Sequence, residues 1–180
     1  MKHDIDYIGA VRSVLDSLEL EYTEKRREDG DNIFRLYMPM KNGPQLLIKL
    51  VVDESTGDSR LRSYLLTDVA EAARPALVQK LNELNNEYRF ICLSLDGDGD
   101  LLAAYDFALF GTPQDVGQHA VTAFLLFYDL CDKVFPAIIK TVLAERGSVG
   151  EEEAEDWDEE ETDEELKNLF APSGNPEPLL

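Results

Sequence analysis

Cysteine, histidine and tryptophan are scarce in this sequence of 180 residues. It contains two cysteines, two histidines and one tryptophan. Two histidines exclude a three-histidine zinc site, and the apolar neighbours of Cys92 and Cys131 suit buried, reduced thiols better than a disulfide framework. The sequence also lacks a GxSxG elbow and a glycine loop that could hold phosphate. We therefore expect a protein that is not an enzyme, with no catalytic residues, no cofactor and no metal.

Basic residues are few as well, at 17 against 37 acidic residues, and the formal net charge is −20. Twelve of the carboxylates fall between Glu151 and Glu165. The only contiguous basic cluster, Lys25-Arg26-Arg27, is followed at once by Glu28 and Asp29, and we interpret it as a solvated turn. A negative field repels phosphate backbones and anionic lipids. We therefore expect neither nucleic acid nor a membrane as a partner.

Long hydrophobic runs are missing too. The longest uncharged stretch, Val116–Tyr128, is too short to span a bilayer. The residues that follow Met1 run straight into an amphipathic pattern, which does not resemble a secretory leader. The expected location is the cytoplasm.

What the sequence does contain is clear hydrophobic periodicity, which alternates between helical and strand spacing. The predicted elements are a helix over residues 4–18, strands over 20–23, 33–40, 45–53 and 60–66, a helix over 75–87, strands over 88–95 and 101–110, and a helix over 112–146. Turn-forming residues separate the strands, as in an antiparallel meander. The predicted fold class is α+β, with an antiparallel sheet, helices on one face and the order α-β-β-β(-β)-α-β-β-α.

The last predicted helix has an unusually wide apolar surface, and Pro136 should bend it partway. One sheet face does not easily cover both its main stripe and the residues beside that stripe. We therefore predict that part of this helix meets a partner chain or a dimer mate. The residues predicted for this surface are Phe124, Phe127, Leu130, Val134, Phe135 and Ile138.

Two local motifs invite a metal or catalytic interpretation. Asp96, Asp98 and Asp100 match the first ligand positions of a calcium loop, but Leu101 and Phe107 replace its glycine and its closing glutamate. A hairpin turn fits this stretch better. His119 has no second histidine on its helix, and we interpret it as a helix-surface or interface residue.

Residues 148–180 lack core-forming periodicity, and like charges in such a run stay solvated. We predict a folded domain over residues 1–147 and a disordered acidic tail over 148–180 with a short amphipathic segment. The tail either keeps the protein soluble or docks, as an autoinhibitory pseudo-ligand, into the groove of its own domain or of a dimer mate. Its large apolar side chains favour docking slightly, and they are Trp157, Leu166, Leu169 and Phe170.

A family resemblance rests on three motifs: Leu81-Asn82-Glu83-Leu84-Asn85, Tyr88-Arg89-Phe90 and the turn from Leu95 to Asp100. With the order of elements, these motifs resemble the YbjN family, which shares the type III secretion chaperone-like fold. The resemblance covers about residues 3 to 145. It implies a compact α+β protomer that is often dimeric and has no known catalytic residues. It also implies a role as a peptide-binding chaperone or a regulator of signalling.

Two hypotheses of different classes follow. The first is a homodimeric, chaperone-like adaptor that binds an apolar segment of a protein or peptide client. The alternative is an enzyme or small-ligand sensor with a cleft between the sheet and the last helix, using residues such as Tyr105 and Asp106. A deep polar pocket would favour the alternative, and a shallow apolar groove would favour the adaptor.

Overall fold

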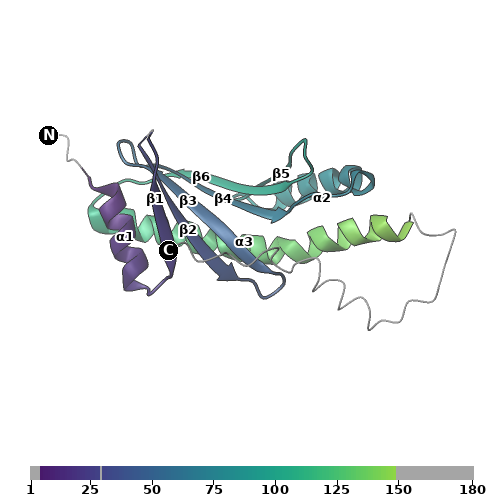
Figure 1. Cartoon of the computed structure of the whole chain (residues 1–180), viewed down its shortest axis with the longest axis horizontal. Helices are drawn as coiled ribbons and strands as arrows, with labels where there is room; N and C mark the ends of the chain where they lie inside the picture. Colours follow the sequence, from purple (N-terminus) through teal and green to yellow (C-terminus); the bar gives the residue numbers. More distant parts are fainter. Residues whose placement is uncertain (1–4, 29, 149–180) are drawn as a thin grey trace, which may run out of the picture. The chain divides into compact units, whose positions relative to one another are not determined.

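A computed structural model describes residues 5–28 and 30–148, and within them six strands form one antiparallel sheet (Figure 1). The spatial order is β1-β2-β3-β4-β6-β5. The strands are β1 (Tyr22–Arg26), β2 (Asp31–Pro39), β3 (Gln45–Asp53), β4 (Asp58–Leu66), β5 (Cys92–Leu95) and β6 (Leu101–Ala108). The antiparallel meander predicted from the turn residues is confirmed, and β3 has the predicted bounds.

The described residues also form three α-helices in the predicted order: α1 (Tyr7–Ser17), α2 (Arg74–Glu87) and α3 (Pro113–Ser148). A 3₁₀ turn, η1 (Glu71–Ala73), precedes α2. Each α-helix begins at a recognisable signal. Asp6 caps α1 by accepting from the Gly9 amide at 2.7 Å, Pro75 occupies the first turn of α2, and Thr112 and Asp115 exchange hydrogen bonds at the start of α3. The α+β class and the order of elements are therefore confirmed.

The two faces of the sheet differ sharply, because successive side chains of a strand point to opposite sides. Phe34, Leu50 and Leu61 lie opposite one another on β2, β3 and β4, and each is fully buried. Their neighbours along the strands, such as Arg35 and Tyr37, are exposed. The described helices cover the first face only, as predicted, and no described helix covers the second face.

Helix α3 buries its wide apolar surface inside the chain, which corrects the prediction that this surface meets a partner. All six residues proposed for that contact are buried: Phe124, Phe127, Leu130, Val134, Phe135 and Ile138. The sheet is not their only cover. The β2–β3 turn contacts α3 through the Tyr128 hydroxyl, which donates to the Pro39 carbonyl, and Lys133 lies 5.0 Å from the ring of Tyr88 after α2.

The β2–β3 turn is fastened to α3 next to Pro136. Proline has no amide hydrogen, so the Asp132 carbonyl four residues earlier loses its usual helical donor. The Asn42 side chain donates to that carbonyl at 3.5 Å, and the Asn42 backbone and side-chain nitrogens donate to the Asp132 carboxylate at 2.9 and 3.0 Å. Gly43 permits this approach, since a Cβ there would lie 2.6 Å from the ring of Phe135.

Two strand predictions needed correction. The basic residues Lys25 and Arg26 belong to β1 rather than to a turn, because they pair with Ile33 and Asn32 of β2. The fifth strand is shorter than the predicted 88–95 and begins at Cys92, since residues 88–91 connect α2 to it.

The bounds of the predicted domain and tail, at residues 147 and 148, stay a prediction because 149–180 lie outside the described residues.

Substitution of Phe127 tests whether the apolar surface of α3 belongs to the core or to a partner contact. We expect Phe127→Ala to lower the free energy of unfolding by about 3–5 kcal/mol, because it removes a fully buried ring. Chemical denaturation at two protein concentrations measures this. Leu125→Ala is the matched control on the same helix, since Leu125 is 47% exposed. A Phe127→Ala variant as stable as Leu125→Ala would contradict the core assignment.

Candidate binding face

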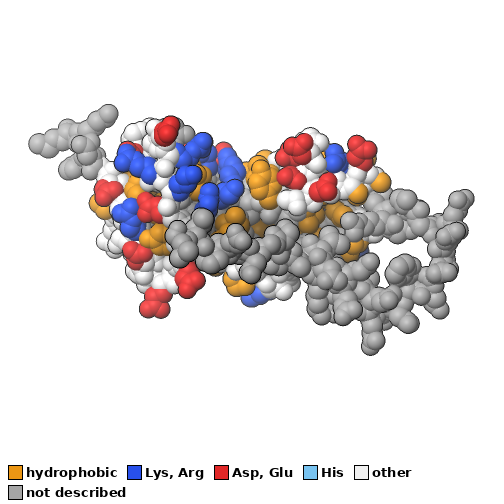
Figure 2. Space-filling model, viewed as in Figure 1, with side chains coloured by type: hydrophobic (Ala, Val, Ile, Leu, Met, Phe, Trp, Pro, Cys, Tyr) orange, Lys and Arg blue, Asp and Glu red, His pale blue; other side chains and the backbone are white. Residues whose placement is uncertain are grey.

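The open face of the sheet carries a row of basic side chains. Arg35 of β2 pairs with Lys49 of β3, and Lys49 pairs with Arg62 of β4, so the three side chains emerge side by side on the same face. We call these three residues the cationic row. Figure 2 shows Lys and Arg side chains gathered over the strands. A chain with a net charge of −20 therefore presents a local concentration of positive charge.

A row of two tyrosines and a leucine, which we call the aromatic row, lies directly beside the cationic row. It consists of Tyr37, Leu47 and Tyr64, and the two tyrosines are 58% and 49% exposed. Tyr37 pairs with Leu47 across β2 and β3, while Leu47 and Tyr64 line one small hollow of about 80 Å³ together with Lys49 and Arg62. Exposed tyrosines are effective contact residues because they combine apolar area with a hydrogen-bonding hydroxyl. We call the cationic and aromatic rows together the binding face.

Much of the positive charge on the cationic row is not neutralised within the described chain. Arg62 contacts the carboxylate of Asp106 at 2.6 Å, and Lys49 lies 5.9 Å from the centre of the Tyr64 ring. Arg35 and Lys49 form no ion pair with any carboxylate in residues 5–28 or 30–148. Two cations are therefore available to an acidic ligand, and Arg62 can exchange its exposed partner.

The sequence contained the parts of this face but not their convergence. The alternation in β2 and β3 already predicts that Arg35, Tyr37 and Lys49 point away from the core. Their distance along the chain conceals that they are neighbours, because only the strand register brings β2, β3 and β4 together. Contiguity along the chain therefore identifies Lys25-Arg26-Arg27 but not the cationic row.

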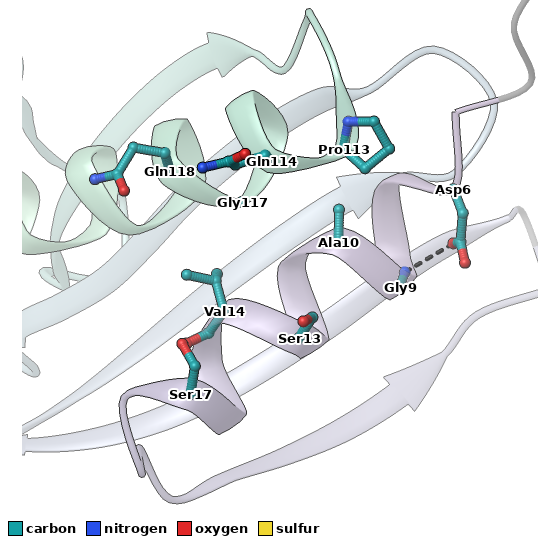
Figure 3. A pocket seen from close by; sticks show the side chains of 10 residues that line it. All are labelled: Asp6, Gly9, Ala10, Ser13, Val14, Ser17, Pro113, Gln114, Gly117 and Gln118. Atoms are coloured by element: carbon teal, nitrogen blue, oxygen red, sulfur yellow. Dashed lines mark hydrogen bonds between the residues drawn. The ribbon is translucent and has the colours of Figure 1, made fainter.

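A separate open groove of about 500 Å³ lies between α1 and the first turns of α3 (Figure 3). Small residues line it, including Gly9, Ala10 and Ser13 from α1 and Gly117 from α3. Gly117 lets the helices cross closely, since a Cβ there would lie 3.1 Å from the Ala10 carbonyl. The only charged residue of the lining is Asp6, and its carboxylate caps α1. This arrangement explains helix packing and offers no set of reacting groups.

The residues suggested for an enzyme or sensor do not converge. Tyr105 pairs with the buried Leu61 and faces the helices, whereas the next residue, Asp106, pairs with Arg60 on the open face. Tyr105 contributes to an aromatic cluster, with its ring 5.8 Å from Phe90 and 5.3 Å from Phe107. The two side chains therefore lie on opposite sides of the sheet and cannot act on one ligand there.

The aspartate-rich segment forms the predicted hairpin turn between β5 and β6. The Asp96 carboxylate accepts from the amides of Asp98 and Asp100 at 3.1 and 2.9 Å, and Arg74 donates to the carbonyls of Gly97 and Asp98. These bonds use Asp96 to shape the turn. Within the described ranges, no group of three or more His, Cys, Asp or Glu residues is arranged to hold a metal ion.

The two cysteines have opposite environments. Cys131 is buried in α3, and burial raises the pKa of its thiol because the thiolate would be desolvated. Cys92 is exposed, which corrects the expectation that both are buried. It pairs with Ala104, which pairs with Arg62, so Cys92 extends the line of the cationic row. The half-buried His119 contacts the ring of Phe110 at 4.7 Å, consistent with a helix-surface role.

The four tail residues predicted to dock, Trp157, Leu166, Leu169 and Phe170, lie outside the described residues. Within the described part, no helix is long and apolar enough to cross a membrane.

Fold and site together define an α+β protein whose helices cover one face of an antiparallel sheet and whose other face presents basic and aromatic side chains. The chain belongs to the YbjN family, since the family's sequence model matches residues 8–140. The description of that family is "Putative bacterial sensory transduction regulator". The predicted family membership is therefore confirmed.

Two solved structures are similar to the chain. The crystal structure of YbjN from E. coli, titled "a putative transcription regulator", has 12% sequence identity and a TM-score of 0.46, covering 71% of this chain and 90% of that one. The HopA1-SchA chaperone-effector complex has 13% identity and a TM-score of 0.42, covering 72% and 95%. No curated protein sequence matches the chain.

The different environments of the thiols predict different reactivity. We expect Cys92 to react rapidly with a disulfide reagent in the native protein and Cys131 to react only after unfolding, because burial suppresses its thiolate. Absorbance of the released thiol measures both phases. Cys92→Ser should abolish the fast phase. Two equally fast thiols in the native protein would contradict the burial of Cys131.

Proposed function

We propose that this protein is a non-enzymatic, chaperone-like adaptor that binds an acidic, aromatic-containing segment of a partner protein on the binding face. The observation that supports the proposal is the cationic row beside exposed tyrosines on a sheet face that no described helix covers. Membership of a family described as regulators of sensory transduction agrees with a binding role rather than with catalysis.

The chemistry of the binding face selects the kind of segment. Arg35 and Lys49 can each form charge-assisted hydrogen bonds with carboxylates, and Arg62 can hold a carboxylate through two parallel bonds. An aromatic side chain of the partner can pack against Tyr37 or Tyr64. An apolar client on α3, the form of the adaptor hypothesis based on sequence, would need side chains that are buried. The proposed ligand is therefore an acidic segment.

Partner capture tests the proposal. We expect the full-length protein to retain a specific partner from native lysate and the double variant Arg35→Glu/Lys49→Glu to lose it. The reversal replaces with anions two cations that form no ion pair within residues 5–28 and 30–148. Quantitative mass spectrometry of the retained proteins gives the measurement. Retention should also weaken as salt is raised, since exposed charges are screened.

A charge reversal elsewhere controls for the change in net charge. Lys140 is exposed on α3 and Arg89 is exposed in the segment after α2, so Lys140→Glu/Arg89→Glu makes the same change in total charge. This control should retain the partner. If the wild type, the face variant and the control capture the same proteins in equal amounts, the binding face is not the partner site.

The homodimer and the cytoplasmic location expected from the sequence stay predictions. The residues offered for a dimer contact are buried, but Leu143 of α3 is 42% exposed and offers apolar area outside the core. We expect analytical ultracentrifugation to show a dimer that Leu143→Glu weakens. A monomer at all protein concentrations would exclude it.

A further inference from the structure

The binding face has an acidic segment available within the same chain. Residues Glu151–Glu165 carry twelve carboxylates and no basic residue, and the only tryptophan of the sequence, Trp157, stands among them. This composition combines the two features that the cationic and aromatic rows would bind. We propose that Glu151–Glu165 docks on the binding face of its own chain and that a partner must displace it. The inference rests on the proposed function, because it concerns the same surface.

Charge favours a tethered occupant over a free one. A free acidic segment must approach a chain with a net charge of −20, and the repulsion lowers its rate of association. A segment joined by a short linker is already present at a local concentration on the order of millimolar. At physiological ionic strength the repulsion is screened beyond about 8 Å, whereas carboxylates in contact with Arg35 and Lys49 retain their attraction.

The chain is also long enough. Helix α3 ends at Ser148 and its 36 residues span roughly 54 Å. The 17 residues from Val149 to Glu165 have a maximum reach of roughly 56 Å, which is sufficient for the segment to return along the whole length of the helix. The cationic row itself crosses only from β2 to β4, roughly 10 Å at the spacing of neighbouring strands. A few carboxylates of the segment are enough to cover it.

Two side chains of the unsubstituted protein can serve as probes of the docking in the full-length chain. Cys92 is exposed on the line of the cationic row and can carry a nitroxide spin label, while Cys131 is buried. Trp157 gives the only tryptophan indole N–H signal in an NMR spectrum. We expect the label to broaden this indole signal at low salt, compared with the reduced, diamagnetic label. Broadening should be lost at high salt and in the variant Arg35→Glu/Lys49→Glu.

Controls separate docking on this face from other contacts. Lys140→Glu/Arg89→Glu should leave the broadening in place. In a mixture of spin-labelled protein without isotope and unlabelled ¹⁵N protein, the indole signal should stay sharp, because the docking is within one chain. Without any label, Trp157 fluorescence should shift to longer wavelength in the face variant as the indole becomes solvated.

The inference is overturned by an indole signal that stays sharp at low salt, by broadening that persists in the face variant, or by broadening in the mixed sample, which would show docking between copies. These outcomes are independent of the partner test. A protein that captures a partner through the face but shows no broadening loses only the docking inference. A protein whose indole signal behaves as expected but that captures no partner loses only the proposed function.

Discussion

Helix α3 packs along one face of the sheet, and this contact determines what every other part of the chain can do. Phe124 and Phe127 are fully buried, and removing such a ring from water contributes about 1.5–3 kcal/mol each. The β2–β3 turn must bend onto the helix to cover its flank, which explains the bonds between Asn42 and Asp132 and the glycine at position 43. Because all three described α-helices lie on this side, no described helix covers the opposite face of the sheet.

An open face has to remain compatible with water, and the strands achieve this by alternation. Leu36, Ile48 and Leu50 point into the core, while Arg35, Tyr37 and Lys49 point out from the same strands. Solvation alone would be served equally well by glutamate, the commoner charged residue here, so basic residues at three adjoining positions call for an additional explanation. Ligand binding supplies one.

The sequence was sufficient for the order of elements because each element carries its own periodicity and its own boundary signals. Pro75, the Thr112-Pro113 pair and the turn from Asp96 to Asp100 all act over a few residues, and all lie where predicted. The assignment of α3 to a partner surface failed for a different reason. The pattern shows how wide an apolar stripe is but not how many neighbours cover it, and here the sheet is joined by the β2–β3 turn and the segment after α2.

The binding face shows a related limit of prediction from the sequence, which concerns the proximity of residues in different strands. Alternation predicts the direction of each basic side chain, but proximity depends on strand pairing between residues 14 and 13 positions apart, Arg35 with Lys49 and Lys49 with Arg62. Net charge was a poor guide for a related reason. Total charge governs the field at long range, where salt screens it, whereas recognition depends on the few charges within a Debye length of the ligand. A strongly acidic protein can therefore bind an acidic segment, provided that a tether or a second contact first brings that segment close to the face.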